Sequence, residues 1–364
     1  MSKIIGIAPV SGGAFPSQLA IYSHLIQNEI FCDILLASSG GNIATYIASA
    51  SDWNIDGIRR IIKKLSSRDI FKPWVPIFNS IVGFFYGSIY QSGDGFKKVL
   101  HECFTSDTIV NDEIWTGIYN RERQRPRFMC NRSREDSVFR DCTVDENLSY
   151  CMELTYLNGN IDDIAISSQA SASIPTLIEP QIIEGESYCD GGLSFSSPLQ
   201  GFESMIIDMY MSFHLIYINS MDLQQSINAN TYQNILDNGR LAASELVRGH
   251  LIADRLCAYR MLSARSHRAH IKPNFALLDI SELPIIKMVQ NQTERSLLEL
   301  YPETYEEIDI IDFEGKDIEE LLNKAYKCIK CRFWWIGDPM LLEENRKLYE
   351  KQEKEIQIYW KDGY

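Results

Sequence analysis

The fold of this chain is decided by one stretch of sequence, Ala37-Ser38-Ser39-Gly40-Gly41. Residues 33–37 are mostly apolar and predict a strand, whereas residues 42–48 predict the start of a helix. A serine on a sharp strand-to-helix turn has its hydroxyl held above the sheet, at the helix N-terminus. Such a turn needs small residues two positions to either side, and Ala37 and Gly41 are small. We therefore predict that Ser39 is a nucleophile. The alternative interpretation is a plain strand–turn–helix connection with a Gly-Gly joint.

A carboxylate beside two glycines forms the second motif, Asp190-Gly191-Gly192. The glycines allow other backbone to approach closely. An aspartate can accept the proton of a serine hydroxyl as that hydroxyl attacks an ester carbonyl. An ordinary aspartate, with a pKa near 3.9, is a weak base, so we expect Asp190 to be buried and its pKa to be raised. Ser39 and Asp190 together predict acyl transfer.

The N-terminal segment predicts an oxyanion site. A strand over residues 3–8 is followed by Ser11-Gly12-Gly13 and then by a helix with an apolar face. Backbone N–H groups in such a glycine turn can bind an oxyanion, so we assign this role to Gly12, Gly13 and Gly40. A run of small residues, 170–175, is expected to pack near the same site.

The order of these motifs over about residues 4–200 resembles the patatin-like phospholipase family. The resemblance implies an α/β fold, a three-layer α/β/α sandwich, here with a mainly helical C-terminal extension. It implies a Ser-Asp dyad without histidine that cleaves fatty-acyl esters of phospholipids and neutral lipids, and no cofactor. Ser39 matches the nucleophile, Asp190 the dyad carboxylate, and Gly12 and Gly13 the oxyanion loop.

The glycine loop departs from the pattern of that family, which usually reads Gly-Gly-x-Arg/Lys-Gly. Here it reads Gly12-Gly13-Ala14-Phe15-Pro16. Proline has no N–H group, so one oxyanion donor is absent. The loss of one donor can lower a rate by about a hundred- to a thousandfold. An alternative function is therefore a catalytically weak or inactive patatin-like protein that binds lipid or protein.

Other chemistries are less well supported by the sequence. A nucleotide-binding α/β protein ranks last because neither G-x-G-x-x-G nor a Walker A pattern is present. A Ser-His acyltransferase ranks below the Ser-Asp hypothesis, because none of the six histidines lies near either motif along the chain. The histidines show no metal-ligand spacing, and no metal is expected. Cys328 and Cys331 form a C-x-x-C that we interpret as helix-surface cysteines.

Composition sets the cellular context. With 364 residues, 45% of them hydrophobic, the chain can build a large core. Its net charge of −14 argues against nucleic-acid binding. Nine scattered cysteines suggest reduced thiols in a cytoplasmic protein. No signal peptide or bilayer-spanning run is found, and peripheral membrane association stays open. The expected partners are an acyl-ester lipid at a membrane surface and, as an open question, an activating protein.

Two segments have compositions that favour contact with lipid. The aromatic insertion at about 70–92 contains Phe84, Phe85 and Tyr86, which we predict to face substrate or membrane. A buried helix over the sheet is the alternative. The second segment is rich in arginine and predicts a strand with one charged face. One interpretation is that this face contacts anionic head groups. The alternative is a solvated edge strand. Its arginines are Arg121, Arg123, Arg125, Arg127, Arg132 and Arg134.

We divide the chain into a catalytic domain, residues 1–205, and a part of unknown function, residues 206–364. The second part is expected to complete the sheet and then add a helical cap. We predict strands at 212–218 and 274–280, and helices at 222–265, 317–331 and 340–359.

Overall fold

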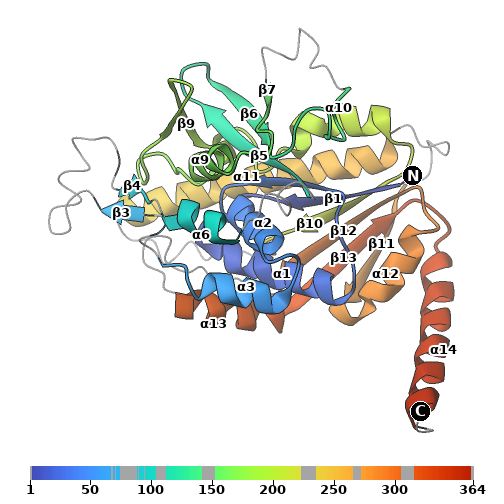
Figure 1. Cartoon of the computed structure of the whole chain (residues 1–364). Coiled ribbons are helices and arrows are strands. Elements are labelled where there is room, and N and C mark those ends of the chain that lie inside the picture. Colours follow the sequence, from blue (N-terminus) through green and yellow to red (C-terminus); the bar gives the residue numbers. More distant parts are fainter. Residues whose placement is uncertain are drawn as a thin grey trace.

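The computed structural model describes residues 2–66, 69, 71–73, 88, 90–93, 95–103, 112–141, 152–222, 235–264, 272–304 and 315–361. Over these residues, an eleven-stranded mixed sheet runs through the molecule in the order β11-β13-β12-β10-β1-β2-β5-β6-β7, with β9 on β5 and β8 on β9 (Figure 1). Its strands are β1 (Lys3–Ala8), β2 (Ile34–Ser38), β5 (Glu113–Asn120), β6 (Arg125–Cys130), β7 (Glu153–Tyr156), β8 (Gln181–Ile183), β9 (Glu186–Asp190), β10 (Phe213–Ile218), β11 (Asn274–Asp279), β12 (Arg295–Pro302) and β13 (Ile329–Trp335).

The centre of the sheet is parallel. β12, β10, β1, β2 and β5 all run in one direction, and β13 and β6 turn back at either side. Parallel strands are covered on both faces, so they are apolar along their whole length. β2 and β10 are buried at every residue, which is why their apolar runs predicted strands. The chain moves from β1 toward β2 and later returns to β10 on the other side. The carboxyl ends of β1 and β10 therefore mark a switch point, where α/β proteins bind ligands.

Helices cover both faces of the sheet, which confirms the expected three-layer arrangement. Two core clusters, one on each face, separate the helices into two layers. One layer contains α10 (Leu199–Met209) and α11 (Ile235–Ser263). The other contains α1 (Phe15–Gln27), α2 (Gly40–Ala50), α3 (Ile55–Ile62), α6 (Gly95–Cys103), α9 (Ile161–Ser171), α12 (Leu283–Gln290) and α13 (Gly315–Tyr326).

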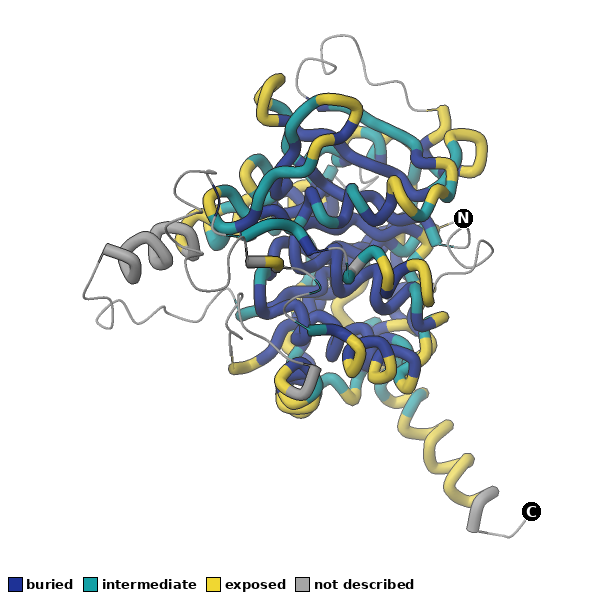
Figure 2. The backbone as a smooth tube through the Cα atoms, turned by 60° about the vertical axis from the view of Figure 1, so that its left-hand side comes forward, coloured by how far each residue is buried: buried dark blue, intermediate teal, exposed yellow. Residues whose placement is uncertain are grey.

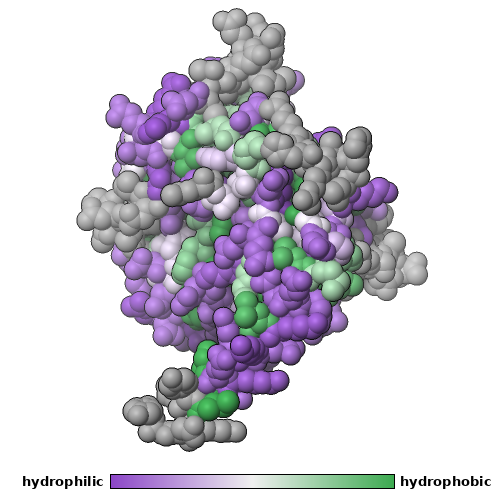
Figure 3. Space-filling view, turned by 90° about the vertical axis from the view of Figure 1, so that its right-hand side faces the viewer, coloured by the Kyte–Doolittle hydropathy of each residue, from purple (hydrophilic) through white to green (hydrophobic). Residues whose placement is uncertain are grey.

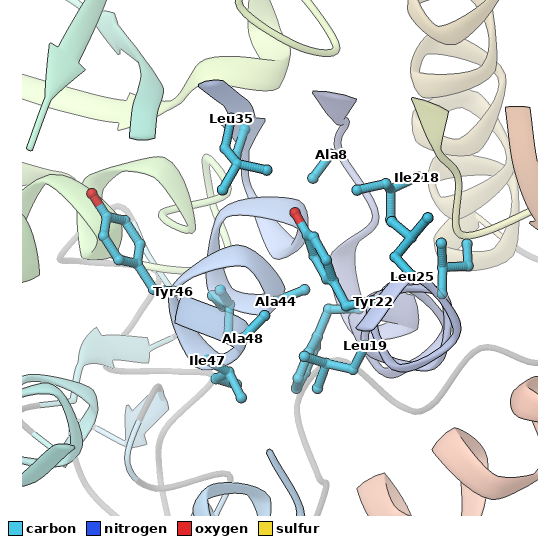
Figure 4. Close-up of a cluster of buried hydrophobic side chains, with 14 of the residues drawn as sticks. Ala8, Leu19, Tyr22, Leu25, Leu35, Ala44, Tyr46, Ile47, Ala48 and Ile218 are labelled. Carbon is cyan, nitrogen blue, oxygen red and sulfur yellow. The ribbon is translucent and has the colours of Figure 1, made fainter. Parts of the chain in front are cut away.

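The packing of α1 and α2 holds the N-terminal half of the sheet. Leu19 and Tyr22 on α1 face Ala44 on α2 beneath the strand residues Ala8 and Leu35 (Figure 4). The Tyr22 hydroxyl is hydrogen-bonded to Thr45 Oγ1 at 2.7 Å, so this buried phenol has a polar partner. Figure 2 shows the buried chain concentrated in these central elements.

The helix predicted over 317–331 is wrong for its last third, residues 327–331. α13 ends at Tyr326, and β13 begins at Ile329 between β11 and β12. Cys331 is buried in β13, and its thiol donates to the Leu278 carbonyl oxygen at 3.2 Å, so it is not a helix-surface cysteine. A strand inside a sheet is buried on both faces, and over seven residues its pattern cannot be distinguished from the end of an apolar helix.

The arginine-rich segment is not an edge strand. Residues 121–124 form a turn, and β6 lies between β5 and β7. Arg123 and Arg125 both pair with Glu153, and Arg127 pairs with Glu184 at 2.8 Å. These carboxylates pair with three of the six arginines for which we considered contact with anionic head groups.

Little of the aromatic insertion is described. Its ends form a short hairpin of β3 (Phe71–Pro73) and β4 (Tyr90–Ser92). Phe84, Phe85 and Tyr86 lie outside the described residues. Within the described part of the chain, no helix has the length and apolar character needed to cross a membrane.

The last helix, α14 (Leu341–Lys361), packs its first turns against α12 and then projects away from the body of the molecule (Figures 1 and 2). Its outer half is exposed, including Ile356 and Ile358. The face that carries it is mostly hydrophilic, with small hydrophobic areas (Figure 3). Strands from both proposed domains share one sheet, and the division near residue 205 stays a prediction.

Candidate active site

Ser39 lies on a tight turn between β2 and α2. Its backbone has φ 55° and ψ −132°, a conformation that residues with a side chain rarely adopt. Close backbone contact keeps it there: a Cβ on Gly41 would lie 2.3 Å from the Ala8 carbonyl oxygen. The Ser39 N–H donates to Ser171 Oγ at 2.8 Å. The turn therefore fixes the serine at the carboxyl end of β2, with α2 beginning directly behind it.

Asp190 lies at the end of β9 and meets Ser39. Ser39 Oγ donates to Asp190 Oδ2 at 2.7 Å, and the other carboxylate oxygen accepts the Gly192 N–H at 2.8 Å. Both side chains are buried, with 1% of Ser39 and 5% of Asp190 exposed. The structure thus joins two residues 151 positions apart in a water-poor environment.

Two glycines make this approach possible. A Cβ on Gly117, in β5, would lie 2.4 Å from Ser38 Oγ, and a Cβ on Gly191 would lie 2.4 Å from the Gly117 carbonyl oxygen. Any side chain at Gly117 or Gly191 would push the serine turn and the aspartate turn apart. This is the close backbone approach that the Asp-Gly-Gly motif predicted.

Burial changes the proton affinity of Asp190. Loss of solvent raises the pKa of its carboxyl to about 6, against the opposing effects of the hydrogen bonds from Ser39 and Gly192. The group is therefore ionised at neutral pH yet more basic than an exposed aspartate. These are the properties expected of a general base.

The glycine loop lies against the serine turn. Gly12 has φ 52°, in the left-handed region, and begins a short 3-10 turn, Gly12–Ala14. A Cβ on Gly40 would lie 2.4 Å from the Gly12 carbonyl oxygen and 2.9 Å from Gly12 N. Gly40 in turn begins α2, where backbone N–H groups have no acceptor within the helix. The structure thus brings Gly12, with Gly13 next to it, close to Gly40.

Phe15 and Pro16 have structural roles at the start of α1. Phe15 is buried in the core, with 2% exposed. Pro16 lies in the first turn of α1, where an N–H group would have no intrahelical acceptor. A proline is well tolerated there, although its missing N–H still removes one donor from the helix N-terminus.

The run of small residues at 170–175 connects both sides of the site. Ser171 Oγ accepts the Ser39 N–H and donates to the Gly117 carbonyl oxygen, each at 2.8 Å. The Ser173 carbonyl oxygen accepts the Asp190 N–H at 3.0 Å. The small size of these residues indicated tight packing, but only the structure shows that Ser171 contacts the Ser39 N–H.

Helix α11 supports the site from the other face of the sheet, and no sequence signal indicated this. His250 Nδ1 lies 2.9 Å from the Gly192 carbonyl oxygen. The buried Asp254 carboxylate accepts from four side chains, those of Ser196, Ser197, Gln200 and Tyr217. The Ser196 carbonyl oxygen accepts the Val10 N–H at 2.8 Å, just before the glycine loop. Helix α11 therefore holds the loops that carry Asp190 and the glycines that we predict to bind an oxyanion.

In the described part of the chain, no histidine is hydrogen-bonded to the side chain of Ser39 or of Asp190. Ser39 Oγ donates to Asp190 instead. Among the same residues, no group of three or more His, Cys, Asp and Glu side chains could hold a metal ion. The arrangement provides a hydroxyl, a carboxylate and backbone N–H donors.

Comparison with known proteins agrees with this geometry. The family model for patatin-like phospholipase matches residues 12–202, slightly more than half of the chain. A comparison with curated proteins gives no match. Among solved structures, the crystal structure of VipD from Legionella pneumophila is similar at 11% sequence identity, over 89% of this chain and 67% of that chain, with a TM-score of 0.31. That TM-score is too low to add support. On the match of the family model, with its α/β fold and its serine and aspartate turns in the matched region, this chain belongs to the patatin-like phospholipase family.

Proposed function

We propose that this protein hydrolyses acyl esters of lipids through a covalent acyl-enzyme, with Ser39 as nucleophile and Asp190 as base. The family supports lipid acyl hydrolysis in general terms. The observation that carries the specific assignment is the buried hydrogen bond of 2.7 Å from Ser39 Oγ to Asp190 Oδ2. A serine hydroxyl that donates to a buried carboxylate can lose its proton as it attacks.

In the first half-reaction, Ser39 Oγ attacks the ester carbonyl carbon and its proton passes to Asp190 Oδ2. The negative charge develops on the former carbonyl oxygen, which we place against the N–H groups of Gly40, Gly12 and Gly13. The ester C–O bond then breaks. Asp190 returns the proton to the leaving alcohol, which is a lysophospholipid when the substrate is a phospholipid.

In the second half-reaction, Asp190 accepts a proton from a water molecule that attacks the acyl-enzyme carbonyl. The same N–H groups stabilise the second oxyanion. When the bond to Ser39 Oγ breaks, the proton returns to Ser39 and the fatty acid leaves. A carboxyl with a pKa of about 6 can both accept and release this proton near neutral pH.

We place the reaction in the cytoplasm at a membrane surface, with a phospholipid or another acyl-ester lipid as substrate. The aromatic composition of residues 71–87 supports membrane contact through Phe84, Phe85 and Tyr86. If an activating protein is required, purified protein will be slow until that partner is added.

The direct test is covalent labelling with a fluorophosphonate probe, mapped by mass spectrometry. We expect labelling at Ser39, no labelling in Ser39→Ala, and much slower labelling in Asp190→Asn. The matched control is Ser23→Ala, which removes a buried hydroxyl from α1 that donates to the Leu19 carbonyl oxygen. Label on another serine, undiminished labelling of Asp190→Asn, or no label on the folded wild type would contradict the assignment.

A second measurement connects labelling to lipid. Fatty-acid release from phosphatidylcholine vesicles should be abolished in Ser39→Ala and in Asp190→Asn, with thermal unfolding showing that both variants remain folded. If Ser39 of the wild type is labelled but no fatty acid is released from any vesicle, the serine is activated and its substrate is another ester.

A further inference from the structure

Ser11 carries a buried hydroxyl that has no partner among the described residues. The residue is 6% exposed, and its Oγ has no hydrogen bond to any residue that the structure describes. It precedes the turn Gly12–Ala14, but its side chain does not cap that turn. A buried hydroxyl usually has a partner, and one without a partner calls for an explanation.

The position of this hydroxyl supplies the explanation. Three atoms of the glycine loop lie near the point that a Cβ on Gly40 would occupy: the Gly12 carbonyl oxygen at 2.4 Å, Ser11 Oγ at 2.5 Å and Gly12 N at 2.9 Å. Gly40 directly follows Ser39 in the chain. The Ser11 hydroxyl and Gly12 therefore lie directly against Gly40, the residue that follows the proposed nucleophile.

The Ser11 hydroxyl and the Gly12 N–H are both groups that can donate to a developing negative charge. A serine hydroxyl has one O–H donor that rotates to suit its acceptor. Donors fixed where the charge develops stabilise the transition state. We propose that the Ser11 hydroxyl is a further catalytic group, which donates a hydrogen bond to the oxyanion formed during acyl transfer to Ser39. The inference rests on the proposed function.

This role also fits the altered loop. Pro16 lacks the N–H group that a glycine would offer at that position. Ser11 adds an O–H donor at the other end of the same loop. Among the described residues no acceptor is assigned to this hydroxyl, and the acceptor that we propose for it forms during the reaction.

The test compares Ser11→Ala with wild type and with Ser23→Ala, the buried-serine control on α1. With an acyl ester, we expect kcat to fall about a hundredfold in Ser11→Ala, as for the loss of one oxyanion donor. KM should stay within about twofold, because the donor acts in the transition state. Removing a hydroxyl without a partner should leave thermal unfolding unchanged, and Ser11→Gly provides a second variant if Ser11→Ala does not fold.

Inhibitor affinity separates a donor from a packing group. A lipid trifluoromethyl ketone forms a hemiketal oxyanion with the serine, whereas the matching secondary alcohol does not. Ser11→Ala should lower the affinity for the ketone by a factor similar to the fall in kcat. The affinity for the alcohol should be unchanged. An unchanged kcat would overturn the role of Ser11, and so would an equal loss of affinity for the ketone and for the alcohol. An unlabelled, inactive wild type would instead overturn the proposed function, and this inference with it.

Discussion

Ser39 and Asp190 meet because β2 and β9 approach the same edge of β5 from opposite ends. Ser38, at the end of β2, pairs with Gly117, and Asp190, at the end of β9, pairs with the next residue, Ile118. The parallel strand and the antiparallel strand thus converge on one point of β5. The register of both strands sets the distance of 2.7 Å between the hydroxyl and the carboxylate.

The pH dependence of the reaction should reflect Asp190. A base must be ionised to accept the Ser39 proton, so kcat/KM should fall about tenfold per pH unit below about pH 6 and level off above it. The measurement is the pH profile from 4.5 to 8 with an uncharged ester. A profile that stays flat down to pH 4.5 would be inconsistent with a buried base.

The raised pKa of Asp190 also determines how this group changes the stability of the fold with pH. The pKa of Asp190 is raised on folding from 3.8 to about 6, so the folded chain holds the proton more tightly than the unfolded chain. Its contribution to stability is therefore present below pH 4 and decreases as the pH rises through about 6. Protonation of Asp190 at pH 5 should thus lower the activity without destabilising the fold. Circular dichroism at pH 5 and pH 7 checks that the structure is retained.

Ser171→Ala should lower both activity and stability. The substitution leaves the buried Ser39 N–H and the Gly117 carbonyl oxygen without their partner. An unsatisfied buried group costs about 1–3 kcal/mol, and the strained serine turn loses a restraint. Ser173→Ala is the matched control, since the Ser173 hydroxyl donates only to the helix carbonyl oxygen of Gln169 among the described residues. Equal kcat and unfolding midpoints for the two variants would refute the role of Ser171.

Gly41→Ala and Gly249→Ala should have opposite effects. A Cβ on Gly41 would lie 2.3 Å from the Ala8 carbonyl oxygen, so β1 and α2 must separate, at a cost of at least about 2 kcal/mol. Around Gly249, in α11, a Cβ would meet no atom within 4 Å from the rest of the described chain, apart from its chain neighbours and the backbone of its own helix. Alanine there should stabilise the protein by about 0.5–1 kcal/mol. Chemical denaturation measures both. A Gly41→Ala protein as stable as wild type would mean that the contact between β1 and α2 is looser than described.

Asp254→Ala should destabilise the protein by about 3 kcal/mol or more, because it leaves four donors, three of them on buried residues, without their acceptor. Since the Ser196 backbone also holds Val10, the activity should fall as well. Asp254→Asn keeps one acceptor oxygen and should lose less. Removing an exposed charge on α14, in Glu353→Ala, provides the control. If Asp254→Ala unfolds like that control, α11 does not organise the site.

Much of the fold could be predicted from local patterns. The apolar runs that became β1, β2 and β10 are buried along most or all of their length, so composition alone marks them. The serine turn could also be predicted, since such a turn requires small residues two positions to either side of the serine, and Ala37 and Gly41 are small. β13 could not, because its short buried sequence continues the pattern of α13. The edge-strand interpretation of the arginines failed because their partners, Glu153 and Glu184, come from distant segments.

The sequence by itself determined which residues have the chemistry: a serine on a strained turn, an aspartate between close backbones, and a glycine loop. Only the tertiary structure decided what these residues touch. It placed Asp190 beside Ser39, Ser171 on the Ser39 N–H, Asp254 beneath the loops and Ser11 against Gly40. The physical reason is that backbone conformation depends on neighbours within a few residues. Contacts across 151 positions depend instead on strand register and on the packing of helices against both faces of the sheet.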